Sequence, residues 1–170
     1  IAADCPVGIH QARVMSRLGI SSSRVFSVDT LPEVTRTAPN TTLATAMDLK
    51  VDSICNAYVT SKSVDHYRIA ATKGQRIIVH CASRGIDSKL DAVLIIGGRD
   101  LLVERRGGLI DFTSPADGIY VLKVHDLTFN GGPAYFYRLS LKQIAAEAAL
   151  PQYASTESVS AFSWPPTGLA

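Results

Sequence analysis

The sequence lacks the short motifs on which several kinds of chemistry depend. Its three cysteines never form a Cys-x-x-Cys pair, so neither a zinc-ribbon nor a thioredoxin-like motif is indicated. It contains no Gly-x-Ser-x-Gly nucleophile elbow and no Gly-Lys-Ser/Thr phosphate loop, which the corresponding hydrolases and NTPases require. No stretch approaches the ~18 consecutive apolar residues of a membrane-spanning helix. The sequence therefore indicates neither an enzyme nor a membrane span.

An excess of one charge is also lacking. Lys and Arg together number 17 and Asp and Glu 15, for a net charge of +2. The basic residues are scattered, apart from Arg105-Arg106. Nucleic-acid-binding domains carry a concentrated basic patch, so no nucleic-acid partner is expected. The content of 46% apolar and 19% charged residues is typical of a globular protein.

From residue 49 onward the sequence is dominated by short strand-like runs. They are separated by turns rich in Gly, Asp and Ser, and long helical periods are absent between them. About eight such runs at spacings near ten residues predict an all-β protein with a jelly-roll-like antiparallel β-sandwich. The expected strands are Ser53–Val59, Asp65–Ala70, Arg76–Ala82, Ala92–Ile96, Leu101–Glu104, Leu109–Thr113, Ile119–His125 and Tyr135–Leu141.

The pattern divides the chain into four parts. Residues 1–28 predict a β-hairpin with its turn near residues 18–22, and residues 29–38 a linker. Residues 39–142 form the predicted sandwich, and residues 143–170 a short helix followed by a Ser/Thr-rich linker. The sequence begins without a start Met or an apolar leader region. We expect the chain to be a fragment of a larger multidomain protein.

Alternation within the strands indicates which residues form the core, although the internal face of each strand is open at this stage. The expected core is Tyr67, Ile69, Ile77, Val79, Leu94, Ile96, Phe112, Tyr120, Leu122, Val124, Phe136 and Leu139.

Cys55 and Cys81 each lie within an expected strand, and Cys5 lies near the N-terminus. Two interpretations remain open. Both strand cysteines can be buried free thiols, or they can form a disulfide if the compartment is oxidising. Because three is an odd number, one thiol is left over in either case.

The titratable residues give no indication of a catalytic site. His80 and His125 lie in apolar strands and are expected to be packed or at the rim of the core, whereas His66 is expected to be exposed and His10 lies in the hairpin. Most Asp residues lie in turns, where the side chain caps its own backbone. We therefore predict no catalytic residues and no cofactor.

The aromatic residues allow a binding hypothesis. Most are expected in the core, but Tyr135 and Tyr137 share one face of a late strand. Tyrosines on a sheet face can stack on an extended polymer and still form hydrogen bonds. This suggests a polymer-binding face around Tyr135, Tyr137 and Arg138.

An ordered series of short sequence marks runs from residue 39 to residue 141. The marks are Pro39-Asn40, Ala44-Thr45-Ala46, Asp65-His66-Tyr67-Arg68-Ile69, Lys73-Gly74-Gln75-Arg76-Ile77, Leu90-Asp91-Ala92-Val93-Leu94, Gly97-Gly98, Asp111-Phe112, Pro115-Ala116-Asp117-Gly118-Ile119-Tyr120-Val121 and Tyr135-Phe136-Tyr137-Arg138-Leu139. This series resembles the bacterial pre-peptidase C-terminal domain, and residues 1–28 resemble the end of the immunoglobulin-like domain that often precedes it. The resemblance implies a jelly-roll-like, non-catalytic domain of secreted or envelope proteins.

The resemblance also implies a calcium site in the linker of some relatives, but this chain departs from it. Arg36 and Ala38 stand where those relatives have acidic residues, and Thr41 follows Asn40 where an acidic residue or Asn is usual. Calcium prefers carboxylate and other hard oxygen ligands. No metal is therefore expected.

Together these observations predict a non-catalytic accessory or structural domain of a larger secreted or cell-envelope bacterial protein. Its expected partners are other domains of the same parent chain. The alternative is a binding module for an extracellular polymer, either a matrix protein or a glycan.

Overall fold

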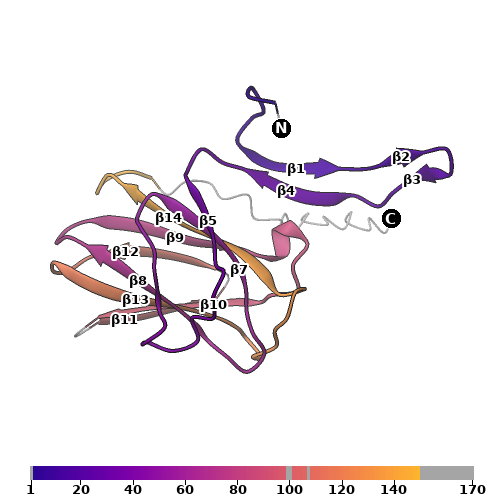
Figure 1. Cartoon of the computed structure of the whole chain (residues 1–170). Helices are drawn as coiled ribbons and strands as arrows, with labels where there is room; N and C mark the ends of the chain where they lie inside the picture. Colours follow the sequence, from indigo (N-terminus) through magenta and orange to yellow (C-terminus); the bar gives the residue numbers. More distant parts are fainter. Residues whose placement is uncertain (1, 99–100, 107, 150–170) are drawn as a thin grey trace, which may run out of the picture.

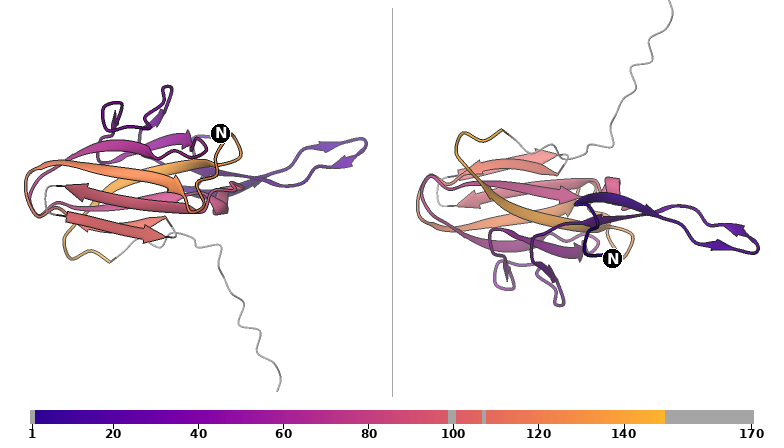
Figure 2. Two further views of the ribbon diagram at one scale, coloured as in Figure 1. Left: turned by 90° about the horizontal axis from the view of Figure 1, so that it is seen from below. Right: turned by 90° about the horizontal axis from the view of Figure 1, so that it is seen from above.

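The computed structural model describes residues 2–98, 101–106 and 108–149, and its regular structure is almost entirely β (Figure 1). Two five-stranded sheets form the body. One has the order β11-β10-β13-β8-β6 and the other β12-β9-β14-β7-β5. The views in Figure 2 show them as two layers, and the apolar core is drawn from both. The predicted all-β sandwich is therefore confirmed.

The strands of the first sheet are β6 (Met47–Asp48), β8 (Asp65–Ala71), β10 (Ala92–Gly98), β11 (Leu101–Arg106) and β13 (Gly118–Asp126). Those of the second are β5 (Glu33–Thr35), β7 (Ser53–Tyr58), β9 (Arg76–Ala82), β12 (Leu109–Thr113) and β14 (Phe136–Ile144). Each of the predicted strands lies on one of these. Neighbouring strands of both sheets are antiparallel, except that β5 runs parallel to β7 and β6 runs parallel to β8.

The predicted core is confirmed at every position but one. Phe136 is only half-buried, whereas its neighbour Tyr137 is 1% exposed. Successive residues of a strand point to opposite faces, so Phe136 lies on the opposite face of β14 from Tyr137 and Leu139. The expectation for Phe136 was wrong because both faces of that strand begin with an aromatic residue.

The segment expected to be a linker also contributes a strand. Glu33–Thr35 forms β5 at the edge of the second sheet. The backbone N–H of Arg36 then donates to the Asn56 carbonyl oxygen at 3.0 Å. A linker was expected here, and its pairing with β7 was not.

The N-terminal hairpin projects from the body of the molecule (Figures 1 and 2). It consists of β1 (Gly8–Ala12) with β4 (Arg24–Val28) and, towards its tip, β2 (Met15–Ser16) with β3 (Gly19–Ile20). Its base lies beside the short 3-10 helix η1 (Arg84–Ile86). There the Val25 N–H donates to the Asp87 carboxylate at 3.1 Å. The hairpin was predicted, although its turn is tighter than expected.

The helix predicted to begin at Gln143 is not present in the described residues. Gln143 and Ile144 belong to β14 and pair with Ile77 and Arg76. The Arg76 guanidinium donates to the carbonyl oxygens of residues 146 and 148, both at 2.8 Å. These tertiary contacts override the helix propensity of this alanine-rich stretch. The rest of the predicted helix and linker, residues 150–170, lies outside the described residues.

Cys55 and Cys81 are buried free thiols, and Cys5 is also free. Both strand cysteines pair in register with Leu139 on the strand between them. Neighbouring strands lie about 4.8 Å apart, which places their Cα atoms roughly 10 Å apart. A disulfide needs Cα atoms within about 7 Å. The sheet register therefore favours the free-thiol interpretation.

We predict that thiol titration of the denatured chain, without reductant, detects all three cysteines. A sample reduced beforehand serves as the control and should give the same value. Recovery of one thiol per chain before reduction, rising to three after it, would contradict the register argument.

Two loops at one end of the sandwich are joined backbone to backbone. The Lys62 N–H donates to the Phe129 carbonyl oxygen, and the Gly132 N–H to the Val59 carbonyl oxygen, both at 2.8 Å. Gly131 lies so close that an added Cβ would be 2.2 Å from the Ser61 nitrogen. Only glycine fits there without moving the backbone of the neighbouring loop.

We predict that Gly131→Ala lowers the free energy of unfolding by about 1–3 kcal/mol, as overpacking does. Gly118→Ala is the matched control, because a Cβ there meets no heavy atom within 4 Å. Urea denaturation of both variants tests this. Equal stability of the two would show that the loops are not held in close contact.

Candidate functional site

Among the described residues, several titratable side chains converge on Asp65, which is buried at the start of β8. Its carboxylate is 0% exposed. One oxygen accepts from Arg36 Nη1 at 2.8 Å, and the other accepts from the Tyr137 hydroxyl at 2.7 Å. Convergent groups of this kind are the first place to look for acid–base chemistry.

Arg36 connects the entering segment to this carboxylate. Its Nη1 also donates to Asn40 Oδ1 at 2.7 Å, and its Nη2 donates to the Tyr58 carbonyl oxygen. The guanidinium carbon lies 5.5 Å from the centre of the Tyr58 ring. Asn40 in turn donates to the His66 carbonyl oxygen at 2.8 Å. One guanidinium thus holds residues 36–40 against β7 and β8.

A chain of hydroxyl and thiol groups continues from Asp65 through the core. The hydroxyls of Tyr137 and Tyr67 are 2.6 Å apart, and the Cys55 thiol lies 3.7 Å from the Tyr67 oxygen. Tyr67 is on β8 and Tyr137 on β14, so the bond joins the two sheets. The chain uses the hydrogen-bonding capacity of groups that would be costly to bury unpaired.

Burial dominates the protonation of these groups. It raises the pKa of Asp65, and the Tyr137 hydrogen bond and the Arg36 charge oppose that rise. It also raises the pKa values of Tyr67, Tyr137 and Cys55. A nucleophilic cysteine needs a lowered pKa and access to substrate. Cys55 has neither, being 0% exposed.

The side chains of the Asp65 cluster therefore satisfy one another's hydrogen bonds, and none of them is presented as a reactive group. Within the described part of the chain, every buried side-chain nitrogen and oxygen has a hydrogen-bond partner. Burial also disfavours the charged form of His80 on β9 and lowers the pKa of this histidine to about 4. The polar groups inside the sandwich are thus engaged in internal contacts.

The residues predicted to form a polymer-binding face do not share one surface. Tyr137 is in the core, and its hydroxyl is used by Asp65 and Tyr67. Tyr135 is half-buried and packs against the core. Arg138 lies on the opposite face of β14, where it pairs with Glu33 at 2.7 Å. The expectation for Tyr137 was wrong because alternation identified a common face without showing that the face is internal.

The positions at which some relatives carry acidic calcium ligands hold a cationic residue and two uncharged ones in this chain. Arg36 places a guanidinium beside Asp65 and Asn40, whose oxygens it occupies. Ala38 is exposed and Thr41 half-buried, and neither carries a carboxylate. No group of three or more His, Cys, Asp or Glu that could hold a metal ion occurs in the described residues. These residues do not fit a calcium ion.

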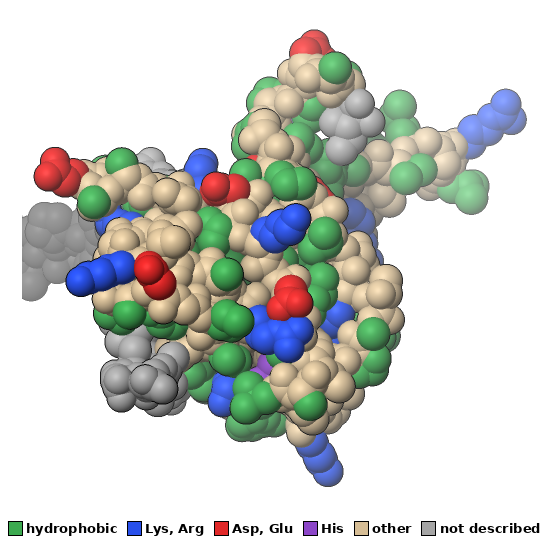
Figure 3. All heavy atoms as spheres, turned by 60° about the vertical axis from the view of Figure 1, so that its left-hand side comes forward, with side chains coloured by type: hydrophobic (Ala, Val, Ile, Leu, Met, Phe, Trp, Pro, Cys, Tyr) green, Lys and Arg blue, Asp and Glu red, His purple; other side chains and the backbone are tan. Residues whose placement is uncertain are grey.

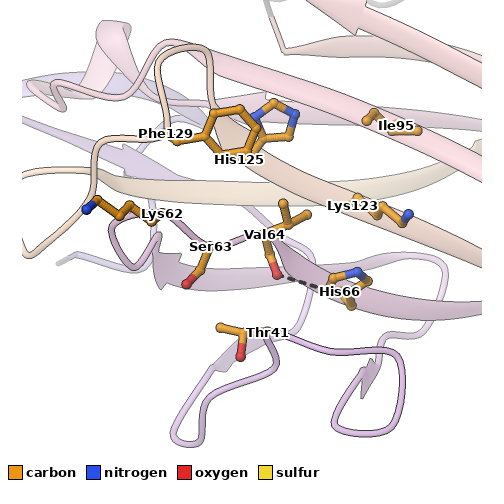
Figure 4. Close-up of a pocket in the computed structure, with 9 residues that line it drawn as sticks. All are labelled: Thr41, Lys62, Ser63, Val64, His66, Ile95, Lys123, His125 and Phe129. Atoms are coloured by element: carbon orange, nitrogen blue, oxygen red, sulfur yellow. Dashed lines mark hydrogen bonds between the residues drawn. The ribbon is translucent and has the colours of Figure 1, made fainter.

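A surface depression of about 480 Å³ lies on the outer side of the first sheet, near one end of β8 and β13. His66 and His125 line it together with Lys62, Lys123 and Phe129 (Figure 4). His66 is 9% exposed, not exposed as expected, and its Nδ1 lies 2.9 Å from the Val64 carbonyl oxygen. Elsewhere, basic and acidic side chains are interspersed over the face shown in Figure 3.

Comparison with known proteins finds only distant structural likenesses. No family model and no curated protein matches the chain. Among solved structures, it is similar to the periplasmic g-type lysozyme inhibitor PliG of Salmonella Typhimurium, with 18% identity over 58% of this chain and 99% of that one, at a TM-score of 0.45. It is also similar to Aeromonas hydrophila PliG, with 16% identity over 56% of this chain and 96% of that one, at a TM-score of 0.41.

The pre-peptidase C-terminal domain of Bacillus anthracis collagenase is another similar structure, with 13% identity over 67% of this chain and 100% of that one, at a TM-score of 0.44. The expected resemblance thus has a structural counterpart at low sequence identity. No ligand and no activity is carried over from these structures. The described residues contain no helix both long and apolar enough to span a bilayer.

We predict that Arg36→Met lowers the free energy of unfolding by about 3–5 kcal/mol, because it leaves a buried charge uncompensated. Adding Asp65→Asn should restore part of that loss by removing the charge. Urea denaturation of the two single variants and the double variant measures the coupling. If the loss of unfolding free energy in the double variant equals the sum of the losses in the two single variants, the ion pair would be contradicted.

The pH dependence of Arg36→Met has a definite sign. Burial raises the pKa of Asp65 above its usual value, and removing the Arg36 charge removes an influence that opposes the rise. A carboxyl with a raised folded-state pKa favours folding at low pH and loses that contribution as pH rises through this pKa. The variant should therefore regain stability relative to wild type as the pH is lowered from neutrality. A difference in unfolding free energy between wild type and variant that stays constant with pH would contradict this expectation.

Proposed function

We propose that the chain is a non-catalytic accessory module of a larger secreted or cell-envelope protein, with other parts of the same parent chain as its partners. The observation that carries this proposal is the closed state of the Asp65 cluster. Asp65, Tyr67 and Tyr137 are 0%, 0% and 1% exposed and are bonded to one another. A general base or nucleophile must reach its substrate, and these groups face each other, Arg36 and Cys55 inside the sandwich.

The same cluster supports a positive role for the module. Arg36 fixes the segment that enters the sandwich, and β5 pairs with β7 immediately before it. The Val25–Asp87 hydrogen bond holds the base of the projecting hairpin to the turn after η1. The module is built to hold the chain that precedes it in a set direction, as a spacer or positioning domain requires.

Tyr137→Phe and Asp65→Asn test the proposal when assayed with the wild-type chain on panels of peptide and glycoside substrates. We expect no turnover above a buffer blank for any of the three. Tyr137→Phe should also reduce stability by about 1–3 kcal/mol, because it leaves the buried Asp65 carboxylate and the Tyr67 hydroxyl each without one partner. Wild-type turnover that disappears in a folded Tyr137→Phe variant would overturn the proposal.

A further inference from the structure

The depression on the first sheet is assembled from several separate segments. His66 on β8 and Lys123 on β13 are cross-strand neighbours, and Ile95 on β10 is the next residue across the sheet. Lys62 comes from the loop before β8, and Phe129 from the loop after β13. In Figure 4 Lys62 lies to one side of the His125–Phe129 pair, and Lys123 with His66 lies to the other.

The lining is basic. Lys62, Lys123 and two histidines contribute to it, and none of the lining residues that the structure describes is Asp or Glu. Neither lysine takes part in the ion pairs found among the described residues. The carboxylates next in sequence are committed elsewhere: Asp65 to the core cluster, and Asp126 to Thr128, Asn130 and the Asp91 N–H. The depression therefore suits an anion.

A flat ring surface lies between the basic groups. The rings of His125 and Phe129 are stacked with centroids 4.5 Å apart and an angle of 5° between their planes. Because His125 covers one face of Phe129 and the latter is 45% exposed, the ring presents apolar surface to solvent. Val64 and Ile95 add aliphatic surface, and Thr41 and Ser63 add hydroxyls (Figure 4).

The backbone at this site adopts conformations that L-residues rarely take. Lys62 has φ of 57° and Phe129 has φ of 58°. The Lys62 N–H donates to the Phe129 carbonyl oxygen at 2.8 Å, so the two strained residues hold each other. Gly or Asn adopts this conformation more easily. Strain of this kind is concentrated at ligand sites, and here it positions a cation and an aromatic ring.

We infer that this depression binds an acidic polysaccharide through its uronate units. The C–H face of one sugar ring packs on Phe129, and carboxylates of the same or adjoining units reach Lys62 on one side and Lys123 on the other. The repeated charges of a polyuronate match basic groups on both sides of a ring surface, and the hydroxyls of Thr41 and Ser63 match those of a sugar. An acidic peptide offers the charges without the ring. The inference goes beyond the proposed accessory role and does not require it.

Titration calorimetry with oligogalacturonate tests the inference on the whole chain at low salt. Lys62→Asn and Lys123→Gln should each weaken binding about tenfold, the loss expected for one charge-assisted contact. Lys142→Gln, on an exposed position of the other sheet, should change affinity by less than about twofold. Because Asn tolerates the left-handed conformation, Lys62→Asn should not lower the melting temperature. Reduced affinity in that variant therefore cannot be attributed to unfolding.

Two further probes make the test specific. A fully methyl-esterified oligogalacturonate lacks the charges, and an oligoglutamate peptide lacks the sugar ring; both should bind at least about tenfold more weakly. The inference is overturned if oligogalacturonate shows no saturable binding, or if its binding is unchanged in Lys62→Asn and Lys123→Gln. Equal binding of the ester would exclude the role of charge. Equal binding of oligoglutamate would assign the site to acidic peptides instead.

Discussion

The structure depends on the burial of one carboxylate, that of Asp65. A charge in a low-dielectric interior is tolerated only when it is paired and hydrogen bonded. Arg36 supplies the opposite charge, and the Tyr137 hydroxyl supplies a second donor. Because Arg36 lies 29 residues before Asp65, pairing the two brings the entering segment onto the sandwich. The resemblance implied acidic calcium ligands in this segment; the chain instead brings its own cation.

The interior polar cluster and the outer depression behave in opposite ways. In the cluster, the Tyr137 and Tyr67 hydroxyls join β14 to β8, and each donor has its acceptor. Satisfied polar networks of this kind specify how two layers meet, and they leave no group to react. In the depression, basic groups lie on both sides of an exposed ring, and no carboxylate is among the described lining residues. The same strand β8 therefore contributes structure through Asp65 and Tyr67 and a binding surface through His66.

Strand positions were accessible from the sequence because turn residues and alternation mark them locally. The internal face of β14 was not, since Phe136 and Tyr137 are both aromatic and only the partner sheet decides between them. The strand β5 has exposed side chains throughout, so no alternation reveals it. The stretch after Lys142 has helical propensity, but Arg76 and β9 hold its start in the sheet. The depression needs the order β10-β13-β8, which local patterns do not contain.

Native-state hydrogen exchange tests most directly whether the Asp65 pair makes the entering segment part of the sandwich. The informative amide is that of Arg36, which is bonded to the Asn56 carbonyl oxygen at 3.0 Å. If the account is right, it exchanges only through global unfolding, as slowly as the amides of the central strands β14 and β13. Exchange as fast as that of the projecting hairpin would show that the segment opens on its own, and would contradict the account.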